Sequence, residues 1–171
     1  ISYEKVLASK KAGGFAACIN ALKAQGFSGC NVTLPFKEEA YVLSDFHSER
    51  AKRARAANTL KFNRDGSVFA DNTDGVGLIR DIQNNIGYSL KNKRILICGA
   101  GGAVRGILFS ILEQQPAGLS IANRTDEKAL KLTGEFADVM AIEVLRYQDL
   151  VNREFDVIID GTSFTDESLP L

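Results

Sequence analysis

Apolar residues in the second half of the chain follow two alternating periods, that of a buried strand and that of a helix. Residues 94–98, four of them apolar or small, lead directly into a glycine-rich turn at residues 99–103, and apolar positions at helical spacing continue to Leu112. Strands separated by helices are typical of a parallel sheet, so this pattern predicts a Rossmann-like, doubly wound α/β domain. Its remaining elements are predicted as a helix over residues 126–137 and strands over 118–122, 139–144 and 155–159, the last of them buried.

The first half of the chain shows the same periods in shorter elements. Strands are predicted at residues 2–7 and 29–34, separated by a helix that ends near Gly26. The apolar face of this helix consists of Phe15, Ile19 and Leu22. A second helix is predicted from Pro35 to about Ala56, with two inward residues, Leu43 and Phe46.

A hairpin is predicted next, with strands over residues 59–63 and 67–70 on either side of an Asp-Gly turn. A polar break at residues 71–75 separates this hairpin from a helix whose apolar positions are Leu78, Ile79, Ile82 and Ile86. The strand-and-helix pattern restarts after this connecting helix. We therefore predict a smaller α/β domain over residues 1–75 and the Rossmann-like domain over residues 76–171.

Composition narrows the class of protein further. Basic and acidic residues both number 21, so no global positive field indicates a nucleic-acid partner, and no apolar run reaches the length of a membrane span. Cys18, Cys30 and Cys98 lack the spacing of a zinc site or a disulfide framework, so we expect buried thiols and no metal. These features favour a cytoplasmic protein, and our default expectation is a monomer or homodimer that acts on a small molecule. Because the chain starts with Ile1 rather than Met, we expect its natural start to lie upstream.

The glycine-rich turn indicates a dinucleotide site. Gly99 and Gly101 match the first two glycines of the G-x-G-x-x-G fingerprint; Val104 occupies the sixth position, and Gly102 partly substitutes for the missing glycine. Glycines let the backbone approach a pyrophosphate, whose charge the free N–H groups of a helix start then meet. The alternative is an ordinary strand–turn–helix connection that contains glycines.

The end of the second strand of this domain discriminates between dinucleotides. Asn123-Arg124-Thr125 stands there, with Lys128 one helical turn later, where an NAD site usually carries a carboxylate for the ribose hydroxyl. A guanidinium and an ammonium suit a 2′-phosphate instead. The sequence therefore favours NADP, although a turn with solvated charges would show the same residues.

Three polar clusters at element ends are candidates for chemistry, at residues 31–37, 57–60 and 71–75. A hydride transfer to a carbonyl needs a proton donor beside the developing alkoxide, and these clusters are better candidates for it than the sole histidine. The alternatives are a solvated Lys37, an Asp74 that caps the following helix, and an Asn58 that satisfies a turn. His47, the sole histidine, falls inside the predicted helix, and we do not expect it to be catalytic.

Taken together, the clusters resemble those of shikimate dehydrogenases. That family carries N-V-T-x-P-x-K, A-x-N-T-L, D-N-T-D-G, G-A-G-G-A and N-R-T in this order, and all five motifs occur here between Asn31 and Thr125. The resemblance implies the reversible NADPH-dependent reduction of 3-dehydroshikimate to shikimate, on the route to aromatic amino acids, by an oxidoreductase with a substrate-binding domain ahead of its NADP domain.

The resemblance also implies roles for individual residues. Lys37 is the catalytic lysine and Asp74 its partner carboxylate, and both contact the substrate together with Thr33 and Asn58. Glu49 matches a family position near the cofactor. The remaining cofactor residues are Gly99, Ala100, Gly101, Gly102, Ala103, Asn123, Arg124, Thr125 and Lys128.

The sequence departs from the family in places. Residues 160–163 read D-G-T-S where the family has N-A-T-S. We also expect the family's first strand with its serine-containing loop, and its later strands and C-terminal helices, to be missing from this chain, which would expose an apolar sheet edge. The alternatives are an NAD-using quinate/shikimate dehydrogenase, a non-catalytic dinucleotide-binding module, and one domain of a larger multifunctional polypeptide.

Overall fold

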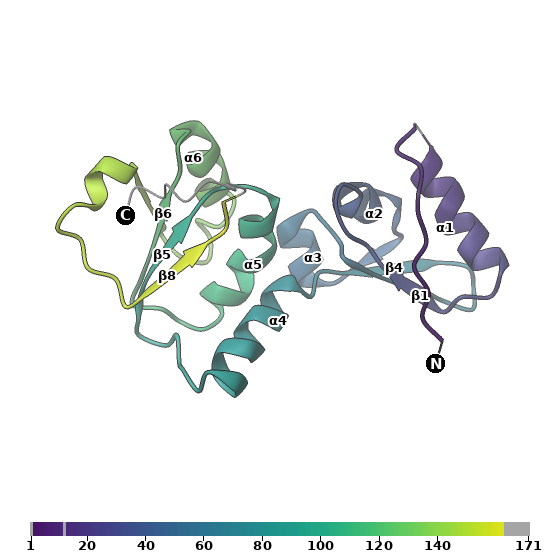
Figure 1. The fold of residues 1–171 in the computed structure, drawn as a ribbon, viewed down its shortest axis with the longest axis horizontal. Coiled ribbons are helices and arrows are strands. Elements are labelled where there is room, and N and C mark those ends of the chain that lie inside the picture. The colour runs from purple at the N-terminus through teal and green to yellow at the C-terminus, as the bar shows by residue number, and fades with distance from the viewer. Residues whose placement is uncertain (1, 12, 163–171) are drawn as a thin grey trace. The chain divides into compact units, whose positions relative to one another are not determined.

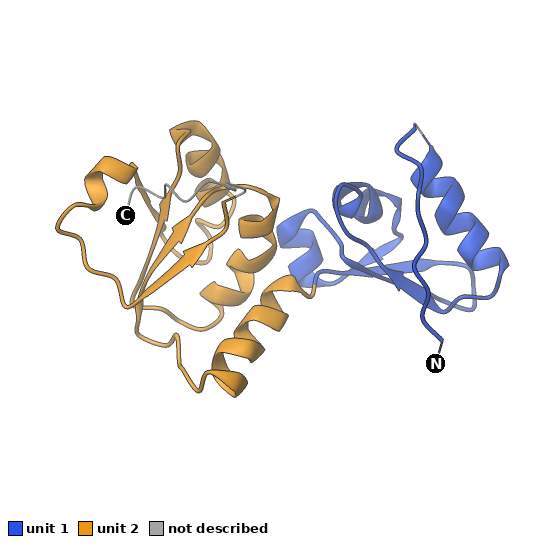
Figure 2. Cartoon of the chain, in the orientation of Figure 1, with its two compact units in different colours: residues 1–72 blue, residues 73–171 orange. Residues whose placement is uncertain are grey.

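The computed structural model describes residues 2–11 and 13–162. The chain divides into two compact units, residues 1–72 (unit 1) and residues 73–171 (unit 2), coloured separately in Figure 2. Each unit combines helices with its own four-stranded sheet, as Figure 1 shows. The predicted α/β class is therefore confirmed for both halves of the chain.

Unit 1 is built on a mixed sheet with the strand order β1-β3-β4-β2. The pairs β1–β3 and β3–β4 are antiparallel, and β2 runs parallel to β4. Its core lies between this sheet and the first helix, where Phe15, Ile19 and Leu22 pack against the buried Leu60 and Val68. The elements of the unit are α1 (Gly14–Ala24), β1 (Gly29–Asn31), α2 (Lys37–Leu43), β2 (Phe46–His47), α3 (Glu49–Ala54), β3 (Thr59–Phe62) and β4 (Val68–Asp71).

The single helix predicted from Pro35 to Ala56 is wrong, because α2, β2 and α3 share this stretch. The backbone between the two helices pairs with the edge of β4: the Asp45 amide donates to the Val68 carbonyl (2.9 Å). The Asp45 carboxylate in turn accepts the Val68 amide (2.7 Å). These bonds replace the helical ones and turn Phe46 outward, so that it is 58% exposed instead of directed inward.

Two predicted strands of unit 1 are also corrected. Residues 2–7 contain no regular secondary structure, and β1 ends at Asn31, three residues earlier than expected. Beyond Asn31 the Val32 amide still donates to the Asn58 carbonyl (2.8 Å), in register with the β1–β3 pairs, and the chain then enters a loop with a cis peptide bond before Pro35. The predicted hairpin is confirmed as β3 and β4, with Gly66 at a φ of +88° in the turn.

Unit 2 contains a fully parallel sheet with the strand order β7-β6-β5-β8. In chain order these are strands three, two, one and four, which is the order found in one half of a Rossmann fold and a neighbouring strand. The predicted Rossmann-like arrangement is confirmed. The elements are α4 (Asp74–Arg80), a π-helical turn (Asp81–Asn85), β5 (Arg94–Cys98), α5 (Gly102–Leu112), β6 (Gly118–Ala122), α6 (Asp126–Gly134), β7 (Glu143–Leu145), a 3₁₀ turn η2 (Tyr147–Leu150) and β8 (Val157–Asp160).

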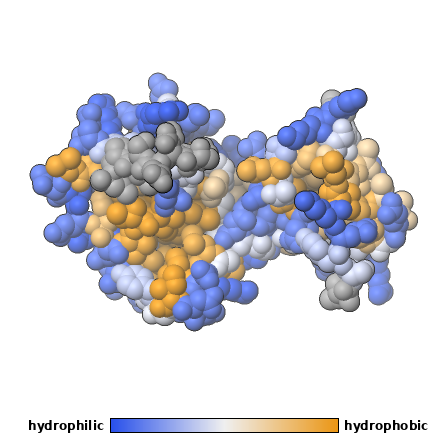
Figure 3. Space-filling model, in the orientation of Figure 1, coloured by the Kyte–Doolittle hydropathy of each residue, from blue (hydrophilic) through white to orange (hydrophobic). Residues whose placement is uncertain are grey.

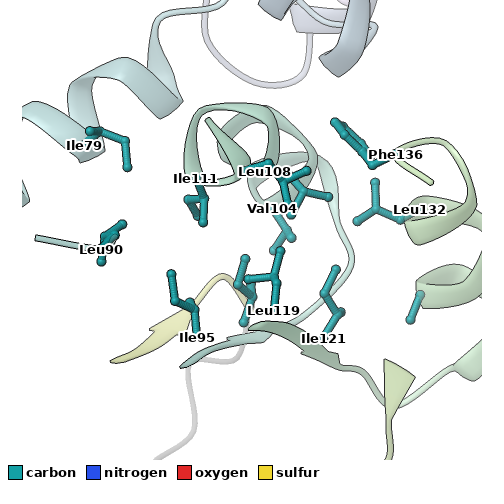
Figure 4. Packing of buried hydrophobic residues seen from close by; sticks show 13 residues of the cluster. Ile79, Leu90, Ile95, Val104, Leu108, Ile111, Leu119, Ile121, Leu132 and Phe136 are labelled. Carbon is teal, nitrogen blue, oxygen red and sulfur yellow. The ribbon is translucent and has the colours of Figure 1, made fainter. Parts of the chain in front are cut away.

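The main core of unit 2 lies on the helical face of this sheet. Figure 4 shows Leu108 and Ile111 of α5 directed toward Ile95 and Leu119 of the strands, with Phe136 beside them. Each fully buried side chain of this size contributes about 1.5–3 kcal/mol. The other sheet face carries a smaller cluster of Leu96, Cys98 and Ala122, covered by Tyr147, Leu150 and Phe155.

Two expectations for unit 2 are wrong. Strand β8 is not fully buried, since Ile158 is 51% exposed, and Figure 3 shows hydrophobic residues at the surface over β5 and β8. Among the described residues, β8 pairs only with β5, which leaves its outer side without a strand neighbour. Ile86 is 69% exposed instead of buried with Leu78 and Ile79, because the π-helical turn changes the direction of the side chains after α4.

Candidate functional site

One end of the sheet in unit 1 brings three of the polar motifs together. Asn31 at the end of β1 pairs with Thr59 at the start of β3, and Thr59 pairs with Asp71 at the end of β4. His47, at the end of β2, pairs with Ala70 one step before Asp71. Motifs separated by up to forty residues in the sequence therefore lie in adjacent strands, at the same end of one sheet.

Backbone hydrogen bonds attach Lys37 to this end of the sheet. The Lys37 carbonyl, in the first residue of α2, accepts the Ala57 amide (2.8 Å). The next residue, Asn58, donates its own amide to the Asp71 carbonyl (3.0 Å). Lys37 and Asn58 are both half-buried, and Thr33 is exposed on the loop before α2. Lys37 and Asn58, two of the predicted substrate residues of unit 1, are thus attached to the same end of the sheet.

Side-chain hydrogen bonds orient Asn58. The Thr59 hydroxyl donates to Asn58 Oδ1 (3.0 Å) and accepts from the Asn31 amide nitrogen (3.3 Å). The Tyr3 hydroxyl donates to the Asn31 side-chain carbonyl (3.2 Å), so the chain Tyr3–Asn31–Thr59–Asn58 spans the sheet end. A fixed amide of this kind distinguishes a substrate hydroxyl from an analogue that lacks it.

Asp71 is the residue that sequence reasoning missed. Its carboxylate accepts two bonds from Arg50, from Nε (2.7 Å) and Nη2 (2.6 Å), and one from the Ser48 hydroxyl (2.5 Å). Burial acts to raise the pKa of Asp71, but the hydrogen bonds from Arg50 and Ser48 outweigh it and hold this pKa below its ordinary value. The only sequence signal was its place at the start of the D-N-T-D-G motif.

Asp74 begins α4, the first helix of unit 2. The residue at the N-cap position is Thr73, so the alternative that Asp74 caps this helix is wrong. Its carboxylate in the first turn faces the favourable end of the helix dipole. A Cβ on the next residue, Gly75, would lie 2.6 Å from the Ser110 hydroxyl of α5, so this glycine allows α4 and α5 to pack closely.

The glycine turn of unit 2 combines a fixed end with an open side. Gly99 has a φ of +99°, and a Cβ there would lie 3.0 Å from the Gly161 carbonyl oxygen. By contrast, a Cβ on Gly101 or Gly102 would meet no atom within 4 Å. This open backbone surface precedes the first turn of an eleven-residue helix, where N–H groups have no intrahelical acceptor. The arrangement fits the pyrophosphate of a dinucleotide.

Two departures from common motifs lie next to each other here. Val104 occupies the sixth position of the fingerprint, and Gly161 stands where shikimate dehydrogenases have alanine. A Cβ on Gly161 would overlap Val104 Cγ2. An alanine at residue 161, directly after β8, would therefore require the Val104 side chain to shift.

The predicted residues for the adenosine phosphate lie together at the end of β6. The Asn123 side-chain amide donates to the Thr125 carbonyl (2.8 Å) and shapes the turn into α6, while Arg124 and Lys128 are exposed. Beside this turn is an open depression of about 510 Å³, lined by Asn123, Arg124, Thr125, Asp126, Glu127, Arg146, Tyr147 and Gln148. The Arg146 guanidinium pairs with the Asp126 carboxylate there (3.1 Å).

Glu49 belongs to unit 1, whereas all other predicted cofactor residues belong to unit 2. It is the first residue of α3 and 59% exposed, and it pairs within its own helix with Lys52 and Arg53 (3.6 Å each). His47 lies on β2 instead of in a helix, with its Nε2 2.7 Å from the Tyr41 carbonyl oxygen.

The remaining chemistry-bearing groups are structural. All three cysteines are free; Cys98 is buried, and Cys18 and Cys30 are half-buried. Burial raises the pKa of the Cys30 thiol to about 11, which keeps it protonated and unreactive. The described residues contain no cluster of metal-ligating side chains, and no helix among them is long and apolar enough to cross a membrane.

Comparisons with known proteins agree with this geometry. A family profile described as the shikimate dehydrogenase substrate binding domain matches residues 1–60, and one described as shikimate / quinate 5-dehydrogenase matches residues 81–169. Shikimate dehydrogenase (NADP(+)) of Chromobacterium violaceum is 50% identical over 163 residues, which are 95% of this chain and 59% of that protein. The chain thus spans less than two thirds of the length of this curated relative.

Solved structures share the fold of most of this chain. An Ael1 enzyme from Pseudomonas putida superposes with a TM-score of 0.86 at 45% identity, covering 92% of this chain and 57% of that one. Shikimate dehydrogenase from Aquifex aeolicus gives a TM-score of 0.81 at 31% identity, covering 95% and 59%. The second profile alone matches more than half of the residues. This chain therefore belongs to the shikimate/quinate 5-dehydrogenase family.

Proposed function

We propose that the protein is an NADP-dependent shikimate dehydrogenase, which reversibly reduces 3-dehydroshikimate to shikimate on the route to aromatic amino acids. The observation that carries the proposal is the bond from the Ala57 amide to the Lys37 carbonyl, which sets the lysine beside Asn58 at one end of the unit 1 sheet. Two motifs thereby supply a proton donor and a polar substrate ligand to one place. The name of the Chromobacterium violaceum relative, shikimate dehydrogenase (NADP(+)), supports the same substrate and cofactor.

In this proposal Lys37 handles the proton of the reaction. Its ammonium donates to the ketone oxygen as the alkoxide develops, and in the reverse direction its amine takes the hydroxyl proton. Asp74 matches the partner carboxylate of the family motif and accepts a hydrogen bond from a substrate hydroxyl. Thr33 and Asn58 bind the remaining hydroxyl groups, and the bond from Thr59 keeps the Asn58 amide in one orientation. Several fixed polar groups of this kind make the site selective for a hydroxylated ring acid.

Unit 2 fits the cofactor in this proposal. The open backbone at Gly101 and Gly102 receives the pyrophosphate, with Gly99, Ala100 and Ala103 completing the turn. The 2′-phosphate lies against the group formed by Asn123, Arg124, Thr125 and Lys128. When bound, NADP(H) supplies or accepts the hydride, and no metal takes part.

The decisive experiment is shikimate oxidation by the protein, with NADP compared with NAD and shikimate with quinate. We expect turnover with shikimate and NADP, and much weaker turnover with NAD, because Arg124 and Lys128 offer positive charge where NAD enzymes carry a carboxylate. Efficient use of NAD with quinate would make the protein a broader quinate/shikimate dehydrogenase. Cofactor binding without turnover of either acid would leave a dinucleotide-binding module and contradict the proposal.

Further parts of the proposal concern location and assembly. The three free thiols favour a reducing compartment, and we propose a cytoplasmic enzyme, monomeric or homodimeric, with neither nucleic acid nor membrane as a partner. Size-exclusion chromatography with light scattering measures the oligomeric state, and a tetramer would contradict this part of the proposal.

A further inference from the structure

A second arginine faces the depression that receives the adenosine phosphate. Arg146 lies directly after β7 and lines this depression together with the motif residues Asn123 and Arg124, although it belongs to none of the family motifs named above. Its guanidinium reaches across to α6, where it pairs with Asp126 through Nε (3.1 Å). The depression is therefore lined by two arginines from different connections: Arg124 follows β6, and Arg146 follows β7.

The backbone of Arg146 is held on both sides. Its amide donates to the Asp149 carboxylate (3.4 Å), and its carbonyl accepts the Asp149 amide (3.0 Å), so that Arg146 is the N-cap of the 3₁₀ turn η2. The next residue, Tyr147, packs on the cluster of Leu96, Cys98 and Ala122 at the ends of β5 and β6. Burial is the main cause that raises the pKa of the Tyr147 hydroxyl, while the nearby Arg124 guanidinium opposes the rise. The backbone from which the Arg146 side chain extends is thus fixed in place, close to Arg124.

Arg146 forms its ion pair with Asp126, the residue that directly follows the N-R-T motif. A carboxylate at Asp126 repels a 2′-phosphate bound to Arg124, and an NAD enzyme would use such a group on the ribose hydroxyl. The Arg146 and Asp126 side chains are 63% and 41% exposed, so their pairing is weak and easily exchanged for a stronger anion. A phosphate that carries nearly two negative charges is such an anion.

We propose that Arg146 is a specificity-determining residue for NADP: it leaves Asp126 and binds the 2′-phosphate together with Arg124. The inference rests on the proposed function for its cofactor and adds a residue to that site. In the absence of the nucleotide, Arg146 neutralises Asp126 and keeps the depression receptive to an anion. The exchange from Asp126 to the phosphate requires only a rotation of the Arg146 side chain, because the backbone stays bound to Asp149.

The test measures binding of 2′,5′-ADP and 5′-AMP by calorimetry, because these probes differ in the 2′-phosphate alone and require no turnover. Arg146→Ala should weaken 2′,5′-ADP about fivefold, as expected for the loss of one exposed charge contact, and leave 5′-AMP unchanged. Arg146→Lys should restore part of the loss, since it keeps the charge but not the planar fork. The matched control is Arg153→Ala, which removes another exposed arginine of unit 2 from an ion pair with Glu143 (3.0 Å) and should change neither probe.

A second background separates direct contact from simple neutralisation. In Asp126→Asn the carboxylate that pairs with Arg146 is gone, so a direct phosphate contact predicts that Arg146→Ala still weakens 2′,5′-ADP by a similar factor. If the effect of Arg146→Ala disappears in this background, or is absent in the parent protein, the inference is overturned. Thermal unfolding of each variant verifies that it is folded.

The failure of this inference is distinguishable from the failure of the proposed function. Loss of 2′,5′-ADP binding in Arg124→Ala, with no effect of Arg146→Ala, overturns the inference and leaves an NADP enzyme. A dependence on Arg146 in a protein that does not oxidise shikimate supports the inference and contradicts the proposed reaction. Equal affinity of the parent protein for the two probes overturns both the inference and the assignment of NADP.

Discussion

In unit 1 the polar groups of the candidate site are held by side chains, whereas in unit 2 the glycine turn is held by backbone conformation. Arg50 and Ser48 fix Asp71, and Thr59 fixes Asn58, all through side-chain hydrogen bonds. In unit 2 the φ of +99° at Gly99 and the open backbone at Gly102 depend on the absence of a side chain. The two regions should therefore respond differently to substitution: unit 1 through lost contacts, unit 2 through added atoms.

The largest expected effect separates the chemistry of unit 1 from the binding role of unit 2. Lys37→Ala should lower kcat for shikimate oxidation by about 10²–10⁴-fold, the contribution typical of a positioned general acid–base group, while the affinity for NADP stays nearly unchanged. Steady-state kinetics and cofactor titration measure the two quantities. Lys61→Ala, at an exposed lysine on β3, is the matched control and should retain full turnover. An active Lys37→Ala protein would remove this lysine from the mechanism.

The next effect tests whether backbone conformation governs unit 2. Gly99→Ala should lower the free energy of unfolding by about 1–3 kcal/mol, because a side chain at this φ is strained and would crowd the Gly161 carbonyl. Gly102→Ala adds its methyl group to open space, so it should leave stability intact and weaken NADP binding instead. Chemical denaturation and cofactor titration of both variants provide the measurements. Equal destabilisation by the two substitutions would contradict the distinction between the fixed and the open side of the turn.

The same contrast explains which parts of the fold were predictable. The strands expected at residues 94–98 and 118–122 match β5 and β6 exactly in their bounds, because a buried parallel strand is marked by its own apolar run. The helix expected over residues 35–56 failed because β2 has only two residues, too few to show a period, and owes its conformation to pairing with β4. Long-range pairing of this kind leaves no local signal.

In the candidate site, too, local motifs were predictable and contacts between residues distant in the sequence were not. Lys37, Asn58 and the glycine turn were predicted because each lies in a motif of neighbouring residues. The bonds from Arg50 to Asp71 join residues 21 positions apart, and the pairing of Arg146 with Asp126 joins residues 20 positions apart. The residue types involved, an arginine and an aspartate, occur throughout the chain, so only the fold reveals which of them meet.

A smaller effect is expected from the side-chain network of unit 1. Arg50→Ala removes two bonds to the largely buried Asp71 carboxylate, so the free energy of unfolding should fall by about 1–3 kcal/mol. Arg64→Ala, at an exposed arginine in the β3–β4 turn, is the control and should have no measurable effect. Denaturant titrations at neutral pH measure both variants. If Arg50→Ala proved as stable as its control, the bonds from Arg50 to Asp71 would contribute nothing measurable to the free energy of unfolding.

The pH dependence of this network has a definite sign. Because the pKa of Asp71 is lower in the folded protein than in the unfolded chain, its contribution is fully present above the unfolded value of about 3.9. It is lost as the pH falls below that value, through the lowered pKa of the folded state. The stability difference between the parent protein and Asp71→Asn should therefore be constant above about pH 5 and shrink at lower pH. A difference that grew on acidification would reverse the assigned direction.

The smallest effect concerns Glu49, the only predicted cofactor residue in unit 1. Its exposed pairs with Lys52 and Arg53 follow helical spacing, and such pairs contribute no more than about 0.5 kcal/mol, so Glu49→Gln should barely change stability. If Glu49 also contacts the cofactor, the KM for NADP should rise while kcat stays the same. A matched Glu38→Gln variant, at an exposed first-turn residue of α2, gives the baseline for losing one surface charge. Identical KM values in the two variants would confine the cofactor residues to unit 2, and a rise specific to Glu49→Gln would mean that a side chain of unit 1 also takes part in holding the nucleotide.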